Sequence, residues 1–308
     1  MTEYLNKFER DGYIILNKVI DEKSINKLRT NFNYEFNDQN NPNLLDVYQL
    51  DNNNLILKDI FLDTSLLQKI QEIFKNQDLN KINIFPPFQI MRNFFPRLKS
   101  HTWHIDASGE FRYRYCKEKL RNKKYFYAKI GIFLQKNTNF GGQIDIIPKS
   151  HKLYSKNNFF NFIKKNFLKL KMNLVKNMST DLKSKYEKSL LNFERLDLNP
   201  GDVIIFDSRI FHRATPIDIN SEKEVIFDKN TNYIKDLDKE KTKYAIYFQI
   251  GNQIGLDSYW YDRSKRVNNS IEIDQWKKTD FEVKNYYKKN IMKTPKLIDF
   301  SINNIFKN

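Results

Sequence analysis

The sequence predicts an α+β protein with a sandwich or jelly-roll core. Apolar residues recur at helical spacing in the N-terminal part, and from about residue 82 the pattern changes to short β-rich runs separated by long connections. Helices followed by many short strands are typical of this fold class. The chain shows no internal repeat and no Pro/Gly/Ser-rich linker, so we expect a single domain over residues 1–308.

The N-terminal part is expected to be mainly helical. Helices are predicted over residues 3–10, 21–36 and 64–74. Gly12 ends the first helix, and residues 13–16 are predicted to form a strand. Asp21 is the expected N-cap of the second helix, because its carboxylate can accept from the free backbone N–H groups of the first turn.

Five strands are predicted in the remainder of the chain, over residues 82–95, 126–134, 143–147, 203–206 and 244–250. Two insertions interrupt them. The segment from about residue 152 to 195 has apolar residues at helical spacing among many lysines. We expect a basic helical insertion that packs outside the sheet or, alternatively, forms a lid over an active site. Residues of about 217–242 are predicted to be a polar loop, and the tail after about residue 265 is assigned as helix.

The composition limits the classes of function. The net charge of +16 is compatible with an anionic partner, but the lysines are spread along the chain without a nucleic-acid motif, so compositional drift is favoured. The single cysteine, Cys116, excludes an intramolecular disulfide and fits a reducing compartment. The N-terminal segment does not resemble a signal peptide, and no apolar run is long enough to span a membrane, so we expect a soluble cytoplasmic protein.

A His-x-Asp pair, His104 and Asp106, offers the first candidate metal ligands. Residues i and i+2 of a strand point to the same side, so these two side chains can share one pocket. His212 follows the apolar run 203–206 and is a candidate third ligand. Two histidines and one carboxylate on one face of Fe(II) leave positions open for a cosubstrate and O₂.

Four segments resemble the phytanoyl-CoA dioxygenase family of Fe(II)/2-oxoglutarate oxygenases, in the order in which that family has them. They are residues 8–13, 103–106, 142–152 and 200–212. The resemblance implies a double-stranded β-helix, a jelly-roll core with N-terminal helices and helical insertions, whose mouth holds iron through His104, Asp106 and His212. It also implies that His151, in the Pro-x-Ser-His turn, is structural. We expect His101 to be a solvated loop residue.

The family binds the far carboxylate of 2-oxoglutarate with a basic residue, usually Arg. The matching strand here begins at Lys243, which can pair with a carboxylate as a point charge but lacks the bidentate fork of Arg. Lys129 on the preceding strand is the second candidate, and Thr215 is a candidate hydrogen-bond donor to the cosubstrate.

The expected activity is that of an Fe(II)/2-oxoglutarate-dependent dioxygenase, which uses O₂ to hydroxylate a C–H bond of a small molecule. The basic insertion and the net charge favour an anionic substrate. Related iron halogenases replace the carboxylate ligand with a small residue, so Asp106 favours hydroxylation over halogenation. Nucleic acid is not expected as a partner, and the sequence does not indicate an oligomeric state.

Three alternatives remain open from the sequence. The lysine in place of the family's arginine would fit a catalytically inactive β-barrel that only binds. A cupin-like metalloenzyme would use the same ligand types without 2-oxoglutarate. A single-stranded nucleic-acid-binding protein would use basic residues and stacking aromatics, although the aromatic residues fall mainly at core-like positions.

Overall fold

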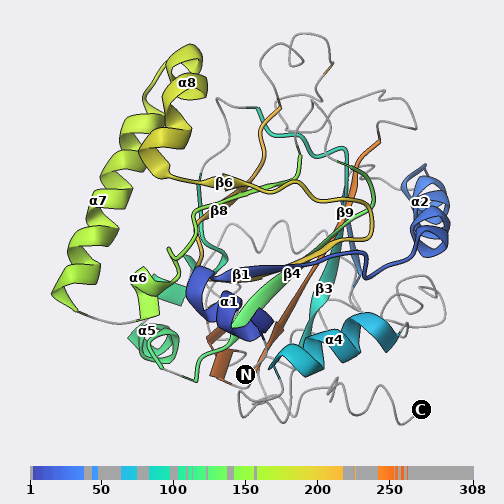
Figure 1. Cartoon of the computed structure of the whole chain (residues 1–308), viewed down its shortest axis with the longest axis horizontal. Coiled ribbons are helices and arrows are strands. Elements are labelled where there is room, and N and C mark those ends of the chain that lie inside the picture. Colours follow the sequence, from blue (N-terminus) through green and yellow to red (C-terminus); the bar gives the residue numbers. More distant parts are fainter. Residues whose placement is uncertain are drawn as a thin grey trace, which may run out of the picture.

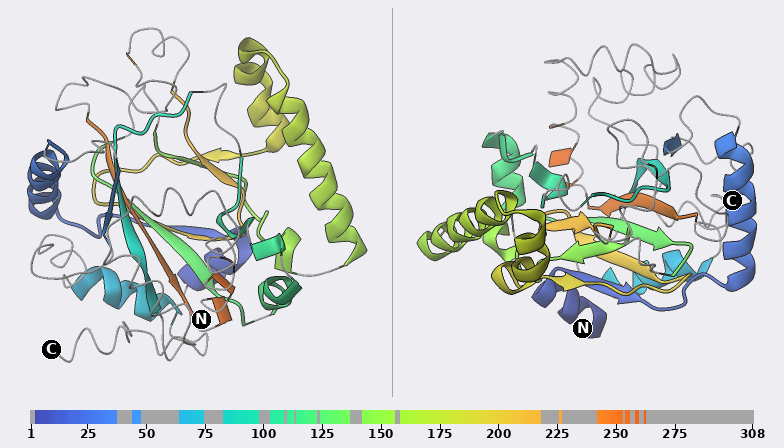
Figure 2. Two further views of the ribbon diagram at one scale, coloured as in Figure 1. Left: turned by 180° about the vertical axis from the view of Figure 1, so that it is seen from behind. Right: turned by 90° about the horizontal axis from the view of Figure 1, so that it is seen from above.

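The fold is built from two antiparallel sheets with helices on both outer sides (Figures 1 and 2). A computed structural model describes residues 3–37, 44–47, 64–74, 83–97, 103–136, 142–217, 226 and 242–262, apart from short gaps at 109, 113, 123, 156–157, 253, 256–257 and 260–261. The predicted tail helix, His101 and most of the predicted polar loop at 217–242 lie outside the described residues. The single-domain organisation over 1–308 stays a prediction.

The larger sheet has six strands in the order β1-β7-β4-β9-β3-β2. Their bounds are Tyr13–Leu16 (β1), Leu44–Val47 (β2), Asn83–Arg92 (β3), Tyr127–Phe133 (β4), Val203–Asp207 (β7) and Tyr244–Gly251 (β9). The central strands β7, β4 and β9 are buried on both faces, apart from the half-buried Lys129. This burial explains why they are nearly continuous apolar runs in the sequence.

The smaller sheet has the order β6-β5-β8, with bounds Ile144–Ile146 (β5), Glu194–Arg195 (β6) and His212–Ala214 (β8). An isolated antiparallel bridge between His104 and His212 extends it by one position. His212 therefore begins a strand of its own instead of trailing the strand that ends at Asp207.

Three apolar clusters hold the layers together. One lies between the two sheets and includes Phe133, Ile146 and Phe206. A second packs the outer face of the larger sheet against α1 (Glu3–Asp11), α2 (Glu22–Asn37) and α4 (Thr64–Phe74). A third packs the outer face of the smaller sheet against α6 (Lys152–Ser155), α7 (Phe159–Lys176) and α8 (Thr180–Leu191). Two facing antiparallel sheets enclosing one apolar core form the jelly roll that the sequence predicts.

Local chemistry agrees with the predicted helix boundaries. The Asp21 carboxylate accepts from the Ser24 backbone N–H at 2.8 Å and caps α2. Gly12 has a φ of +88°, and a Cβ at this position would lie 2.3 Å from Nδ1 of His151. The His151 Nε2 lies 3.2 Å from the carbonyl oxygen of Glu9, so this ring fastens α1 to the turn after β5. Its surroundings are those of a structural residue.

The segment after His104 contains short helical elements, among them the 3₁₀ turn η3 (Glu110–Arg112) and α5 (Arg114–Leu120). No helix in the described part of the chain is both long and apolar enough to cross a bilayer.

Candidate metal centre

His104 and His212 project together into the space between the two sheets. Their backbones exchange both bridge hydrogen bonds, at 3.1 Å from His104 N–H to His212 O and at 2.9 Å in the reverse direction. Directly opposite residues of an antiparallel pair point to the same side. The two imidazole centroids are accordingly 4.4 Å apart.

Asp106 completes a group of three possible ligands. It opens the 3₁₀ turn η2 (Asp106–Ser108), so it reaches the pocket by a turn and not by the strand alternation that the sequence suggested. Its Oδ1 lies 4.0 Å from Nε2 of His104 and 3.7 Å from Nε2 of His212. All three ligand atoms lie within 4.8 Å of one another. This spacing allows one ion to contact all three.

The protonation states suit a divalent cation. A carbonyl oxygen can only accept a hydrogen bond, so the 3.1 Å contact between Nδ1 of His212 and Ile210 O places the ring proton on Nδ1. The lone pair of Nε2 is therefore available to bind a metal ion. Burial lowers the pKa of His212 to about 3, against the opposing charge of Asp106, and keeps the ring neutral. Burial by itself would raise the pKa of Asp106, but electrostatic interactions, of which that with the charged Lys129 is the largest, outweigh it and lower this pKa to about 2.

Asp106 has one oxygen that the protein leaves unsatisfied. Its Oδ2 is buried and accepts no hydrogen bond, although Nζ of Lys129 lies 3.5 Å away as an ion-pair partner. A buried carboxylate oxygen without a hydrogen bond is costly unless a further group binds there. The three side chains therefore fit a metal ion, and the 44% exposure of the His104 side chain leaves the site open on one side.

The predicted cosubstrate residues have different surroundings. Lys129, on the inner face of β4, lies beside Asp106, and its Nζ is 5.2 Å from the Tyr247 ring centroid. Lys243 is 2% exposed, and its Nζ donates to Phe94 O at 3.0 Å. The rings of Phe94, Phe95 and Phe133 surround that Nζ at 5.6 to 6.0 Å, and burial lowers the pKa of Lys243 to about 7.

Thr215 has a contact different from the one expected for it. Its hydroxyl donates to Oδ1 of Asp145 at 2.9 Å. Asp145 is directly opposite Arg213 in the β5–β8 pair, whereas His212 is opposite Ile146. Because alternate residues of a strand face opposite sides, Asp145 and Thr215 lie on the outer face of the smaller sheet, away from the ligands.

A buried ion-pair network lies on that outer face, directly behind the ligands, and sequence reasoning missed it. Arg213 is fully buried and donates to Asp145 at 3.0 Å and to both carboxylate oxygens of Glu187 at 2.7 and 2.8 Å. Trp103 also donates to Glu187, at 3.1 Å, and the Arg213 guanidinium lies 4.5 Å from the Trp103 ring centroid. Arg213 follows His212 and Trp103 precedes His104, so this network fixes both ligand strands from behind.

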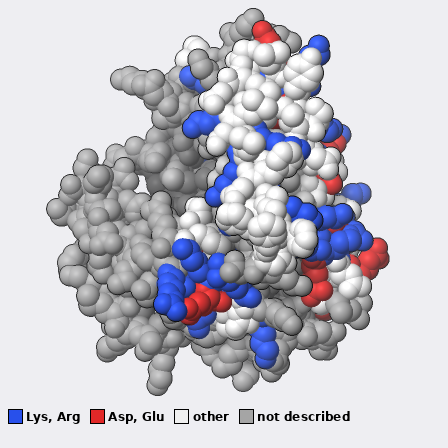
Figure 3. Space-filling model, turned by 90° about the vertical axis from the view of Figure 1, so that its left-hand side faces the viewer, with Lys and Arg blue, Asp and Glu red and all other residues white. Residues whose placement is uncertain are grey.

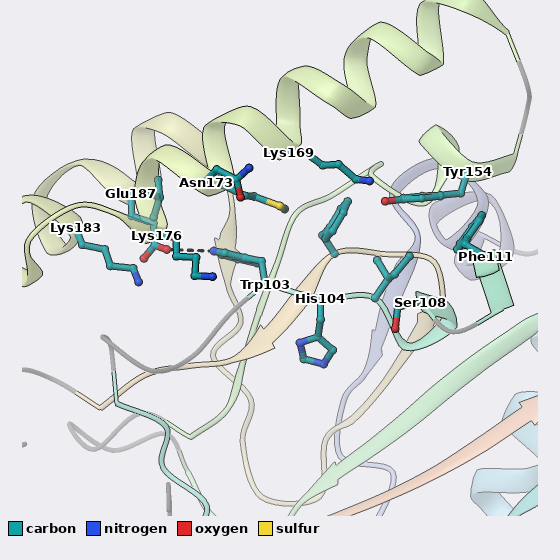
Figure 4. Close-up of a pocket in the computed structure, with 14 residues that line it drawn as sticks. Trp103, His104, Ser108, Phe111, Tyr154, Lys169, Asn173, Lys176, Lys183 and Glu187 are labelled. Carbon is teal, nitrogen blue, oxygen red and sulfur yellow. Dashed lines mark hydrogen bonds between the residues drawn. The ribbon is translucent and has the colours of Figure 1, made fainter. Parts of the chain in front are cut away.

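A cavity of about 630 Å³ lies between helices α7 and α8 and the segment 103–108. Lys169 and Lys176 reach toward it from α7, and Lys183 from α8 (Figure 4). Figure 4 also shows the His104 ring pointing away from α7. His104 also lines the cavity, so the cavity borders the segment that carries this ligand.

Cys116 shows no sign of reactivity. It is buried, its Sγ lies 3.4 Å from Ser258 O, and burial raises its pKa to about 11. A thiol with so high a pKa is a poor nucleophile at neutral pH.

Comparison with known proteins agrees with the predicted family. Residues 8–223, more than half of the chain, match phytanoyl-CoA dioxygenase (PhyH). No curated protein sequence matches the chain at a significant level.

Solved structures align with most of this chain at low identity. SnoN, a non-heme alpha ketoglutarate dependent epimerase from nogalamycin biosynthesis, has a TM-score of 0.49 with 10% identity over 80% of each chain. HygX from Streptomyces hygroscopicus, with nickel and 2-oxoglutarate bound, has a TM-score of 0.47 with 13% identity over 82% of this chain and 87% of that one. EctD from S. alaskensis, with 2-oxoglutarate and 5-hydroxyectoine, has a TM-score of 0.48 with 13% identity over 82% and 76%.

Proposed function

The chain belongs to the phytanoyl-CoA dioxygenase family, and we propose that it is an Fe(II)- and 2-oxoglutarate-dependent oxygenase with His104, Asp106 and His212 as the iron ligands. The observation that carries the proposal is the convergence of three ligand atoms within 4.8 Å around a buried carboxylate oxygen that has no hydrogen bond. Two histidines and one carboxylate are the ligand set typical of non-haem Fe(II) oxygenases.

Bound Fe(II) and 2-oxoglutarate would supply the activation of O₂ for oxidation of a C–H bond. The protein's own contribution is to hold neutral His212 and ionised Asp106 in place and to exclude water on the sheet side of the site. We propose hydroxylation as the outcome, because Asp106 occupies the position that iron halogenases leave to a small residue.

Lys129 is the better placed of the two candidate partners for the far carboxylate of 2-oxoglutarate. It lies on the inner face of the barrel next to Asp106 and is 17% exposed, so a small molecule at the metal could reach it. Lys243 is enclosed by aromatic rings and has a pKa of about 7, so it is only partly charged at neutral pH. The structure thus supports the reverse of the order that the sequence suggested.

We propose a small anionic molecule as the substrate, because the net charge of the chain is +16.

We also propose a cytoplasmic location, because the single cysteine is buried and reduced, which suits a reducing compartment.

Anaerobic titration of Fe(II) and 2-oxoglutarate tests the proposal. The bidentate chelate gives a weak visible charge-transfer band, which we expect in the wild type and not in His212→Ala. His151→Ala is the matched control, because His151 is a buried histidine that does not belong to the group of three candidate ligands, and it should keep the band. No band in the folded wild type at saturating Fe(II) and 2-oxoglutarate would refute the oxygenase and favour an inactive barrel or another metalloenzyme.

A further inference from the structure

Exposed apolar side chains are concentrated on one face of the molecule. The described residues include eleven large hydrophobic side chains that are exposed, and seven of them belong to α7 and two to α8. Phe159 and Phe160 are 71% and 72% exposed, and Leu170 is 65% exposed. Single exposed apolar residues are ordinary on protein surfaces, but a contiguous group marks an interaction site.

Helix α7 has two apolar faces. Its inner face, with Leu168, Met172 and Val175, packs against the outer side of the smaller sheet and accounts for the attachment of the helix. The outward stripe consists of residues at intervals of three or four: Phe160, Ile163, Phe167, Leu170 and Leu174. This stripe has no role in the core, so it needs a partner outside the described fold.

The charges on α7 itself are all of one sign. Helix α7 contains five lysines and no aspartate or glutamate. Figure 3 faces this side of the molecule and shows uncharged atoms with many lysine and arginine side chains around them and a smaller number of aspartate and glutamate side chains at the edges. The Nζ of Lys171 lies 4.9 Å from the Phe167 ring centroid, so a lysine stem covers the edge of the stripe while its ammonium stays at the rim. The partner should therefore be apolar at its centre and anionic at its edge.

A second copy of the chain does not meet this requirement, because pairing two α7 stripes would bring lysines against lysines. A groove-binding peptide is also disfavoured, because the described cavity lies on the inner side of α7 while the stripe is on the convex outer side. A lipid bilayer accepts a convex amphipathic helix, with aromatic and aliphatic side chains below the headgroups and lysines at the phosphates.

We propose that α7 docks on an anionic membrane surface, lying parallel to it with the Phe160–Leu174 stripe among the acyl chains. The helix would bind at the interface without crossing it. The cavity beneath α7 would then be next to the bilayer, with the metal ligands behind it. This proposal does not depend on the oxygenase activity.

Flotation of the full-length protein with vesicles provides the test. We expect binding to vesicles of phosphatidylcholine mixed with phosphatidylserine, much weaker binding to phosphatidylcholine alone, and weakening by salt. The double variant Phe167→Asp/Leu170→Asp should lower the affinity by more than about tenfold, because two side chains no longer enter the apolar layer. Lys164→Glu/Lys171→Glu should lower binding to the anionic vesicles by a similar factor.

Tyr4→Asp is the matched control, since Tyr4 is exposed on α1, away from this face, and its variant should bind like the wild type. Circular dichroism establishes that each variant is folded. The proposal is overturned if the folded wild type does not float with anionic vesicles, or if the α7 variants float as well as the wild type. It is also overturned if light scattering shows a wild-type dimer that Phe167→Asp/Leu170→Asp dissociates, because the stripe would then be a protein interface.

Discussion

The two faces of the small sheet carry neighbouring residues in opposite electrostatic situations. On the inner face, His104, His212 and Asp106 converge, and a buried oxygen of Asp106 accepts no hydrogen bond. On the outer face, Arg213 is matched by the carboxylates of Asp145 and Glu187. The hydrogen-bonded network on the outer face holds the strands in place. The Asp106 oxygen on the inner face, which has no hydrogen bond, is available to bind a metal ion.

The inner face should control metal binding. Asp106→Ala removes the charged ligand. We expect the affinity of this variant for Fe(II) or Ni²⁺ to fall by more than about 100-fold, which exceeds the usual cost of mutating a residue that only contacts a metal ligand. Stability without metal should fall by only about 1 kcal/mol, because Asp106 makes an ion pair with Lys129 but its Oδ2 accepts no hydrogen bond. Anaerobic calorimetry and urea unfolding measure the two quantities. Unchanged metal affinity would contradict the assignment of metal binding to the inner face.

The outer face should behave in the opposite way. Arg213→Met removes the buried cation that Asp145 and Glu187 share, so we expect the free energy of unfolding without metal to fall by about 3–5 kcal/mol. Urea denaturation measures this loss. Arg195→Met is the control, because Arg195 also pairs with Asp145 but is half exposed, and it should cost no more than about 1 kcal/mol. Equal losses for the two variants would contradict the assigned role of the buried network.

Lys243 should make stability depend on pH. Its pKa is lowered from 10.5 to about 7 in the folded state, so between these values the unfolded chain binds more protons than the folded one. The free energy of unfolding should therefore increase as pH rises from about 7 toward 10. We expect the difference between wild type and Lys243→Met to change by about 3–4 kcal/mol over this window. A pH-independent difference, measured by urea denaturation, would show that this lysine is not desolvated.

The smallest expected effect separates the two lysines as ligands of 2-oxoglutarate. Lys129→Met should weaken binding of 2-oxoglutarate to the Fe(II)-loaded protein by about tenfold, the scale of one charge-assisted contact of about 1.5 kcal/mol. Lys243→Met should leave this binding within about twofold of the wild type. Anaerobic titration of the charge-transfer band reports both affinities. The reverse result would restore Lys243 as the cosubstrate residue.

Local sequence patterns were sufficient for the longer elements and for the ligand types, whereas β2, α5 and β8 were not predicted. The Asp21 cap, the turn at Gly12 and the strand ending at Phe133 are encoded by nearby residues, and each is found in the structure. The family was accessible because its motifs recur in a fixed order.

The outer network was not accessible in the same way. Arg213 and Glu187 belong to different elements, and only the packing of α8 on the small sheet brings their side chains together. The aromatic enclosure of Lys243 likewise depends on three phenylalanines from separate segments. Tertiary contacts of this kind leave no periodic or spacing signal in one sequence.

The bridge between His104 and His212 has a consequence for folding. The two halves of the ligand set lie far apart in the chain and meet through a pair of backbone hydrogen bonds. A nascent chain still on the ribosome would have to expose the second histidine before the centre could assemble, and closing so long a loop is entropically slow. Metal uptake should therefore be a late event in folding, and the start of metal binding would report when the barrel is complete.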